Sequence, residues 1–581
     1  LPATHGWSMP STPAIEFLTP SGVAATAVWT SGTRTLVITT TKGDIAEGGA
    51  VKLVVKNTVT PPSVTAAGTA SVGTFDEANV RAIDTGTLKT SATTAGALTN
   101  LSWVLSLNTP GVADTATLTK VVSGNVGAGA CIQIVLPEVA SAAHSWSMAA
   151  AAQDRVVEFV EPSSAKAGIN STTWDAKSRT LIAVTNTSTS IAEGSKIVLR
   201  IRELTTPSSV ISGAYTVAVT TYSSSTPDSN TIIDGPTSIT GAAIVSGALT
   251  GGSWDMETDR PGMVSRLDVA FKTTGKLTAA SIMVLSLPHT LSSAYQRSWT
   301  MKNAAASETE AEKLNPWVLD TSAPSVACLV GARSVSVTAS WSRLSGVLNV
   351  TIAAGEGSIA EGSNVKLQIA DVGTPSSVVG VSSAELKTLD GRHQLIDGPV
   401  SVTTEATKAG VLGGLLTWDP ASDIAGVTSD VTVSLSMGGW VPESGVIDFD
   451  IPAVGESDGV AAGAGVPSDG WRAQSDSQVV IVSPVGVASG AVDASSGKVT
   501  LTAARPVVAN ESIVFKVTRV TNPSSVTGVA KVVVNTKDSA NGKIDGPTDV
   551  TMDAITAGVL TSPMSFVAGT RTPGVTGTAM L

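Results

Sequence analysis

A set of short sequence marks returns four times, in the same order, along this chain of 581 residues. An apolar segment ends in Leu-Pro or Ile-Pro and a Trp follows. A turn of the type Ile-Ala-Glu-Gly comes next, and then a stretch of the type Pro-Ser-Ser-Val. Internal self-similarity of this kind is the signature of a repeat architecture. The repeat constrains the fold more than any single motif, because the chain must build one structure several times in a row.

Alternating apolar residues indicate what that structure is made of. Behind each Ile-Ala-Glu-Gly turn, every second residue is apolar and Lys, Arg or Gln stands between, which predicts strands over residues 51–55, 197–201, 365–369 and 513–517. Such strands have one face on a core and one in water, and a slip of one residue would turn the apolar set outward. Closing strands are predicted over residues 131–136, 282–287 and 446–451, each directly before the Pro.

A second recurring mark divides each repeat into halves. The motif Ile-Asp-Gly-Pro begins at Ile233, Ile396 and Ile544, and the first repeat has Ile83-Asp84-Thr85-Gly86 instead. Because Asp-Gly before Pro is a turn signal, Asp84, Asp234, Asp397 and Asp545 are interpreted as turn residues at a domain boundary. Each half carries an aromatic strand, a central apolar strand and a closing strand. We therefore expect an all-β chain of about eight Ig-like β-sandwiches, in four pairs, in an elongated array.

The marks also set the expected boundaries. The sandwiches are predicted over residues 1–86, 87–138, 139–236, 237–288, 289–399, 400–452 and 453–547, with an incomplete eighth over 548–581 that lacks its closing strand. The fifth holds a short helical insert over residues 304–314, a run rich in Ala and Glu that Asn315-Pro316 stops.

Composition excludes several functions. Charged residues make up 14% of the chain, the net charge is −11, and no Lys/Arg-rich run offsets it, which argues against nucleic acid. No apolar run approaches the ~18 residues of a membrane span. The first residue is Leu and no signal-type segment follows, so a targeting peptide was removed or not included, which favours a secreted, extracellular product.

Cys131 and Cys328 fall in different repeats and are interpreted as buried apolar residues, with an intermolecular bridge as the alternative.

The sequence shows no constellation of catalytic or metal-binding residues. His5, His144 and His289 each follow a Leu-Pro mark in a different repeat, so they cannot meet around one metal. A Ser-His-Asp arrangement lacks partners, and single Asp or Glu residues in turns do not form a calcium loop. The chain is therefore expected not to be an enzyme and to hold no cofactor.

Two residue types remain candidates for exposed contacts. Most of the 12 Trp recur at fixed places in the repeat, which favours core positions over sugar-stacking platforms. Trp317 and Trp440 lie outside that pattern and are the candidate exposed contacts. Acceptors of the type Asn-Xaa-Ser/Thr, candidates for N-glycosylation in a secreted eukaryotic chain, occur at Asn100, Asn170, Asn186, Asn349 and Asn510.

Tandem modules punctuated by Thr-Pro-Ser-Ser and a closing Leu-Pro strand resemble the Ig-like repeat regions of large extracellular proteins from algae and other protists. The pattern is similar to subunits of surface fibrils or flagellar hairs (mastigonemes), and also to bacterial tandem Ig-like adhesins. The resemblance covers nearly the whole chain and rests on period and composition. It implies a structural or adhesive role at the cell surface.

The ends of the chain fall out of phase with its repeat. Leu1-Pro2 looks like the tail of a closing strand, whereas the last repeat stops at Thr578-Ala579-Met580-Leu581 without one. An unpaired sheet edge is a template for β-augmentation, so these six residues are the candidate junction of a head-to-tail homopolymer or of contacts with other surface proteins. A polypeptide that continues beyond Leu581 accounts for the same ends. The alternative function is a carbohydrate-binding or cell-adhesion stalk.

Overall fold

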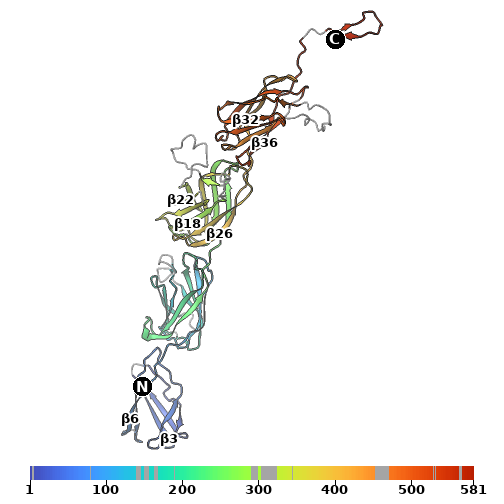
Figure 1. Cartoon of the computed structure of the whole chain (residues 1–581). Coiled ribbons are helices and arrows are strands. Elements are labelled where there is room, and N and C mark those ends of the chain that lie inside the picture. Colours follow the sequence, from blue (N-terminus) through green and yellow to red (C-terminus); the bar gives the residue numbers. More distant parts are fainter. Residues whose placement is uncertain are drawn as a thin grey trace.

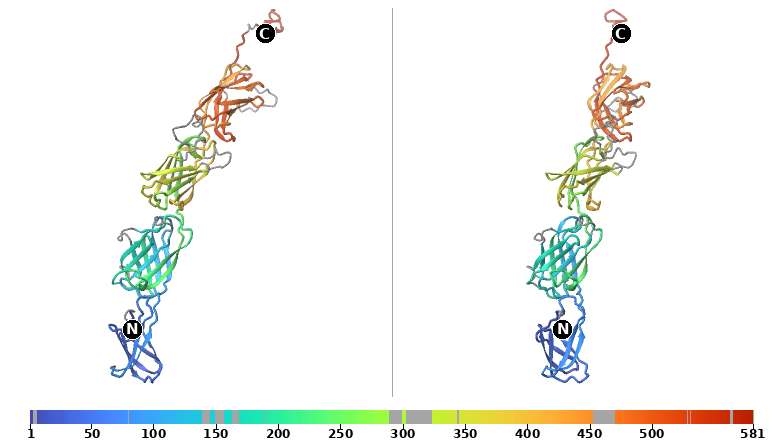
Figure 2. Two further views of the ribbon diagram at one scale, coloured as in Figure 1. Left: turned by 60° about the vertical axis from the view of Figure 1, so that its left-hand side comes forward. Right: turned by 90° about the vertical axis from the view of Figure 1, so that its left-hand side faces the viewer.

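The structure is a computed structural model, which describes residues 1–2, 6–78, 80–138, 145–148, 156–162, 168–188, 190–288, 299–301, 323–342, 345–451, 470–527, 529, 531–561 and 565–580. The chain forms a rod of four successive β units with a small hairpin beyond the fourth (Figure 1). The views in Figure 2 show the same end-to-end arrangement from other sides. The insert predicted over residues 304–314 and Trp317 lie outside the described residues.

Three of the four units are complete sandwiches of two antiparallel sheets. The first sandwich consists of β7 (Thr99–Leu105), β8 (Ala113–Val121), β9 (Cys131–Val135), β10 (Val157–Glu161), β11 (Ile169–Asp175), β12 (Thr180–Thr185), β13 (Lys196–Thr205), β14 (Tyr215–Tyr222) and β15 (Ile232–Gly241), with a 3-10 turn, η4 (Ser229–Thr231), before β15. One sheet has the order β10-β13-β8-β7 and the other the order β11-β12-β9-β14-β15. The predicted strands over residues 131–136 and 197–201 therefore form the middle of the two sheets.

The second and third sandwiches repeat this topology. The second holds β16 (Thr250–Met256), β17 (Val264–Lys272), β18 (Ile282–Ser286), β19 (Thr300–Met301), β20 (Val326–Val330), β21 (Arg333–Val335), β22 (Val337–Ser342), β23 (Val347–Ile352), β24 (Asn364–Gly373), β25 (Ser383–Leu389) and β26 (Leu395–Thr403). The third holds β27 (Gly413–Pro420), β28 (Thr428–Ser436), β29 (Val446–Asp450), β30 (Arg472–Ala473), β31 (Val479–Ser483), β32 (Ala488–Asp493), β33 (Lys498–Ala503), β34 (Ser512–Thr521), β35 (Lys531–Lys537) and β36 (Lys543–Thr551). In both, the closing strand (β18 or β29) again lies in the middle of a sheet.

The N-terminal unit, which we call the open unit, contains only part of this topology. Its strands are β1 (Ile15–Thr19), β2 (Ala24–Thr30), β3 (Thr35–Lys42), β4 (Lys52–Val55), β5 (Thr69–Phe75) and β6 (Ala82–Lys89). They pair as three two-stranded sheets, β1-β4, β2-β3 and β5-β6. These strands correspond to β10–β15, and no strand among the described residues of the open unit takes the place of β7, β8 or β9.

At the other end of the rod, two short strands form what we call the tail hairpin. These strands are β37 (Val567–Ala568) and β38 (Ala579–Met580), and they pair only with each other. The hairpin lies beyond the third sandwich and extends along the rod, away from the open unit (Figure 1).

The predicted fold class, an elongated all-β array of Ig-like sandwiches, is confirmed. However, the sheets build fewer and larger sandwiches than the eight predicted, and residues 138, 288 and 452 are not boundaries. The Leu-Pro mark ends β9, which pairs on one side with β12 and on the other with β14, so strands before and after residue 138 share a sheet. Each sandwich therefore combines the second half of one repeat with the first half of the next.

The recurring Trp residues form the cores, as predicted. In the second sandwich Trp254 packs against Trp299 with ring centroids 4.9 Å apart, and in the third Trp418 packs against Trp471 at 5.6 Å. In the first sandwich the indole N–H of Trp103 donates to the hydroxyl of Tyr215 at 3.0 Å, and Tyr215 packs against Trp146. The Trp of the first strand and the Trp after the Leu-Pro mark thus meet in one core.

Candidate assembly interface

A buried Asp closes each complete sandwich, in an arrangement that we call the Asp latch. Asp234, in β15, is fully buried. Its Oδ1 accepts hydrogen bonds from the Ser123 hydroxyl at 2.5 Å and the Gly124 N–H at 3.1 Å, and its Oδ2 accepts from the Thr221 hydroxyl at 3.2 Å. The Asp latch therefore ties the last strand of the sandwich to the loop that follows β8.

A glycine on the segment before β7 completes the Asp latch. The N–H of Gly96 donates to the carbonyl of Ile233 at 2.9 Å, and the N–H of Gly235 donates to the carbonyl of Gly96, also at 2.9 Å. A side chain at Gly96 would collide with Ser123 and Asp234, so this position requires glycine. The Ala-Gly-Xaa-Leu mark of the sequence is thus the partner of the Ile-Asp-Gly-Pro mark, which the sequence did not reveal.

The second and third sandwiches hold the same device. Asp397 lies beside Gly247 and accepts from the Gly275 N–H at 2.9 Å, and Asp545 lies beside Gly410 and Gly438. Burial raises the pKa of both carboxyl groups. The interpretation of Asp234, Asp397 and Asp545 as turn residues is wrong, because each of the three lies inside a strand at a register shift and is fully buried.

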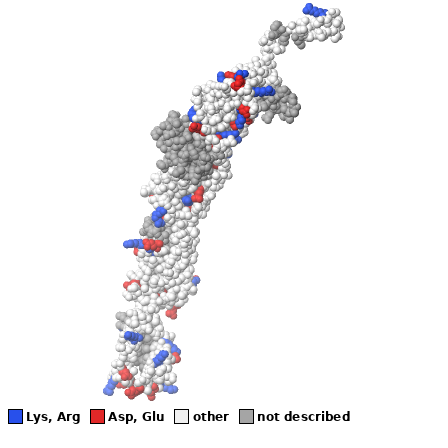
Figure 3. All heavy atoms as spheres, in the orientation of Figure 1, with Lys and Arg blue, Asp and Glu red and all other residues white. Residues whose placement is uncertain are grey.

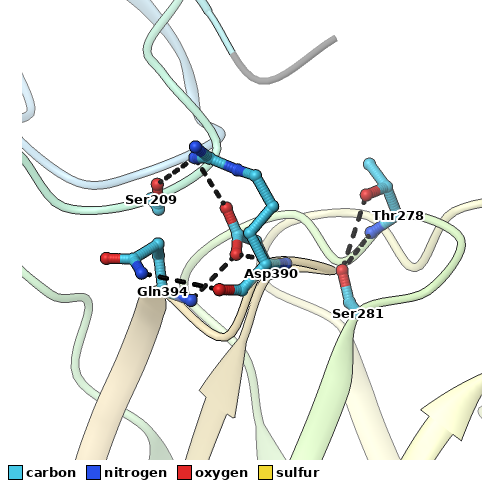
Figure 4. Close-up of polar contacts among 6 residues, drawn as sticks. Ser209, Thr278, Ser281, Asp390 and Gln394 are labelled. Atoms are coloured by element: carbon cyan, nitrogen blue, oxygen red, sulfur yellow. Dashed lines mark hydrogen bonds and ion pairs between the residues drawn. The ribbon is translucent and has the colours of Figure 1, made fainter. Parts of the chain in front are cut away.

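The Pro-Ser-Ser-Val stretches form the junctions between successive units. The backbone N–H groups of Val64, Val210 and Val378 donate to the carbonyl groups of Ile232, Leu395 and Lys543 in the next sandwich, at 2.8, 3.0 and 2.7 Å. At the junction of the first and second sandwiches, Arg392 also contacts Ser209 at 3.5 Å while it pairs with the buried Asp390 (Figure 4). Because the backbone hydrogen bond of the Val recurs at three junctions, successive units are connected end to end in the same way.

Trp440 belongs to one of these junctions and is not an exposed contact. Its side chain is 3% exposed, and a Cβ placed on Gly262 of the second sandwich would lie 2.7 Å from its own Cβ. The prediction of an exposed Trp440 is therefore wrong. Every Trp in the described part of the chain is buried or half-buried.

The open unit keeps the half of the sandwich that β10–β15 form elsewhere. The N-terminal amine of Leu1 donates to the carbonyl of Arg34 at 2.9 Å, in the same place where the N–H of Leu136 donates to Arg179 at 3.0 Å. Leu1 and Pro2 thus occupy the end of the missing β9 position. Asp84 pairs with the hydroxyl of Thr74 at 3.0 Å, as Asp234 does with Thr221, but Asp84 is exposed.

Apolar side chains are exposed at both ends of the rod, some of them at positions that are buried in the complete sandwiches. In the open unit Trp7 is half-buried, whereas its equivalents Trp146, Trp299 and Trp471 are buried. Exposed apolar residues of the open unit are Leu18, Val28, Val37, Ile45, Val51, Val54, Val59, Val72, Phe75, Val80, Ile83 and Leu88. In and before the tail hairpin they are Val559, Leu560, Phe566, Val567, Val575 and Met580.

The other predicted sites are separate from these ends. Among the Asn acceptors, Asn100, Asn170 and Asn510 are exposed, and Asn186 and Asn349 are half-buried. Cys131 and Cys328 are free and buried, and burial raises the pKa of each thiol to about 11. The described residues contain no cluster of His, Cys, Asp and Glu that could hold a metal ion. They also contain no helix long and apolar enough to cross a membrane.

Charge does not mark a binding face on the side of the rod drawn in Figure 3. Acidic and basic side chains are mixed there, on the open unit and on the third sandwich, and uncharged residues cover most of the shaft between them. Leu581 lies outside the described residues, and Thr578, Ala579 and Met580 are exposed.

No protein-family model matches the chain, and no curated protein matches its sequence. Among solved structures, the C-terminal domain of the Streptococcus pyogenes antigen I/II-family protein AspA is similar at 9% identity and TM-score 0.17, over 59% of this chain and all of that one. BcpA, the major pilin subunit of Bacillus cereus, is similar at 9% identity and TM-score 0.19, over 67% and 92% of the two chains. The Escherichia coli adhesin FdeC is similar at 12% identity and TM-score 0.18, over 79% and 99%.

These three similarities are to proteins named as an antigen I/II-family protein, a pilin subunit and an adhesin. None of the three is an algal or mastigoneme protein, so they give no support to that part of the resemblance. At such low identity and TM-score they carry no functional argument, and the two ends of the rod carry it instead.

Proposed function

We propose that this chain is a structural subunit of an extracellular filament or cell-surface appendage, without catalytic activity, that assembles head to tail with copies of itself. The observation that supports the proposal is the complementarity of the two ends. The open unit exposes apolar surface where a complete sandwich has β7–β9, and the tail hairpin exposes apolar residues that correspond to β7 and β8. A head-to-tail contact between unlike ends does not close on itself and yields a filament.

The alternative, a carbohydrate-binding or adhesion stalk, relied on exposed Trp residues that stack on sugar rings. The burial of Trp440 removes one of its two candidates, and Trp317 lies outside the described residues. The filament is therefore the better-supported proposal. Glycans on the exposed Asn100, Asn170 and Asn510 are compatible with it, and glycopeptide mass spectrometry of protein from the native source tests them.

Electron microscopy and analytical ultracentrifugation of the purified chain at rising concentration test the filament. We expect end-to-end multimers whose mass increases with concentration and whose width stays that of one rod. Single rods at every concentration would contradict the proposal.

A further inference from the structure

We propose that residues 557–561 and 565–580 of one copy complete the open unit of the next copy, with the tail hairpin in the positions of β7 and β8. This inference rests on the proposed head-to-tail assembly and names the surfaces that make the contact. The occupant is a second copy of this chain, because its own three sandwiches show the same kind of segment already seated in that place.

The tail hairpin is already folded in the register of β7 and β8. Val567 pairs with Met580 and Ala568 with Ala579, as Val104 pairs with Thr117 and Leu105 with Ala116. The hydrogen bond from the Gly569 N–H to the Thr578 carbonyl likewise corresponds to the one from Ser106 to Thr115. Association therefore needs no change in how these two strands pair with each other.

The free edge of β4 has the register to receive this hairpin. In the first sandwich β13 pairs with β10 on one side and β8 on the other, so that Arg200 lies opposite both Glu158 and Thr117. In the open unit β4 pairs with β1 in the same register and with the same bulge, which places Val54 opposite Glu16. Val54 is thus the equivalent of Arg200, and its cross-strand partner in the next copy is Met580, the equivalent of Thr117.

The Asp latch supplies the second contact. Asp84 already holds the Thr74 hydroxyl in the way that Asp234 holds Thr221, but it is exposed. Gly558 occupies the sequence position of Gly96, whose N–H and carbonyl bind the backbone of the Ile-Asp-Gly segment. We expect the N–H of Gly558 to donate to the carbonyl of Ile83 in the next copy.

An aromatic pair supplies the third contact. In the complete sandwiches the Trp after the Leu-Pro mark packs against an aromatic side chain, at centroid distances of 4.9 to 5.6 Å. Trp7 occupies that place in the open unit and is half-buried. Phe566 occupies the place of Trp103 and Trp254 and is 69% exposed. Contact between Phe566 and Trp7 of the next copy would bury both rings.

Completion in trans fills two of the three empty positions. The tail hairpin supplies no strand for the β9 position, between β3 and β5, where Leu1 and Pro2 lie. We therefore expect the contact between copies to bury less apolar surface than the closure of an internal sandwich.

Disulfide trapping tests the register. The double variant Val54→Cys/Met580→Cys carries one cysteine on each end of the rod, at positions that face each other only between copies. The control is Val37→Cys/Met580→Cys, because Val37 lies in β3 of another sheet and is 39% exposed, as Val54 is. The native Cys131 and Cys328 are buried and should not compete. Under mild oxidation we expect a ladder of covalent oligomers from the first variant, and at least fivefold less from the control.

Sedimentation of the uncrosslinked chain separates the two proposals. Asp84→Ala should weaken association by about fivefold to tenfold, the effect of about 1 kcal/mol for a lost hydrogen-bonding group, while Asp44→Ala in an exposed loop should not. Multimers of the wild type without a selective ladder, or a ladder of equal strength in both variants, would overturn the proposed register but leave the filament in place. Single rods and no ladder would overturn both.

Discussion

Replacement of Lys120 should increase the stability of the first sandwich. It lies in β8 opposite Ile197 and is fully buried, and its Nζ has no hydrogen-bond partner among the described residues. The equivalent positions of the other sandwiches are the buried Phe271 and Leu435. The site is therefore an apolar core position that holds an amine.

The cost follows from the shift in protonation. Burial lowers the pKa of Lys120 from 10.5 to about 7, and the nearby Asp234 carboxylate offsets this only in part. A pKa shift of this size lowers the unfolding free energy by about 5 kcal/mol when the lysine is fully charged. Near pH 7 the loss is about 4 kcal/mol, because half of the folded chains have released the proton. Because the unfolded chain binds a proton between about pH 7 and 10.5 that the folded chain has lost, stability rises with pH across this window and is lowest below it.

Lys120→Met keeps the length of the side chain and removes the amine. We expect the unfolding free energy of the first sandwich to rise by up to about 4 kcal/mol near pH 7, and by much less near pH 10, where the lysine is neutral in the folded chain. Scanning calorimetry of the full chain at both pH values measures the difference. Lys177→Met, in an exposed turn, is the matched control and should change stability by less than about 0.5 kcal/mol.

A loss of stability in Lys120→Met near pH 7 would refute this reasoning. It would mean that the ammonium compensates the Asp234 carboxylate, so that its removal leaves an unpaired buried charge. The hydrogen bonds argue against that result, because Asp234 is satisfied by Ser123, Gly124 and Thr221 instead. An equal gain in unfolding free energy at pH 7 and pH 10 would also contradict the reasoning about the buried amine, since packing alone would then explain the effect.

Four further predictions concern the Asp latches, the junctions and the thiols. Gly247→Ala should destabilise the second sandwich by about 1–3 kcal/mol or more in urea unfolding, because its Cβ would meet Asp397 and Thr274, whereas Gly380→Ala, with open space around it, should be near neutral. Asp397→Asn should flatten the pH dependence of the second sandwich in calorimetry: burial raises the pKa of Asp397 above 3.8, so the wild type loses stability as pH rises through the folded pKa. Trp440→Ala should lower the unfolding free energy by about 3–5 kcal/mol and separate the melting of the second and third sandwiches in calorimetry. A thiol reagent near pH 8 should modify Cys131 and Cys328 only after unfolding, because burial raises the pKa of each thiol to about 11.

The strands were predictable because their signal is local. Alternation over five residues is enough to place β4, β13, β24 and β34 and to say which face is buried. The division into sandwiches was not predictable, because a periodic sequence has no intrinsic starting point and any phase fits the same marks. The Pro after Leu136 was interpreted as the end of a domain, yet it ends a strand whose partners, β12 and β14, follow it by tens of residues.

The Asp latches were missed for a similar reason. Asp-Gly-Pro is a turn signal when the chain is considered alone, but Asp234 lies in a strand where Ser123 and Gly124, more than 100 residues earlier, satisfy its carboxylate. The available signal was the joint recurrence of an Asp with an Ala-Gly-Xaa-Leu mark and with a Thr on the preceding strand. Three such sets, at Asp234, Asp397 and Asp545, indicate a contact rather than three independent turns.

In the proposed filament, folding and assembly depend on the same kinds of contact. In each complete sandwich the Asp latch joins the last strand to the segment before the first strand, and the same sandwich buries a pair of aromatic rings. At the ends of the rod the two partners of one such closure are separated: Asp84 and Trp7 at one end, Gly558 and Phe566 at the other. A change that weakens an internal Asp latch should unfold one sandwich. The matching change at Asp84 should leave the rod folded and reduce only the number of copies that join end to end. Stability and polymerisation can thus be separated by the position of a single type of residue.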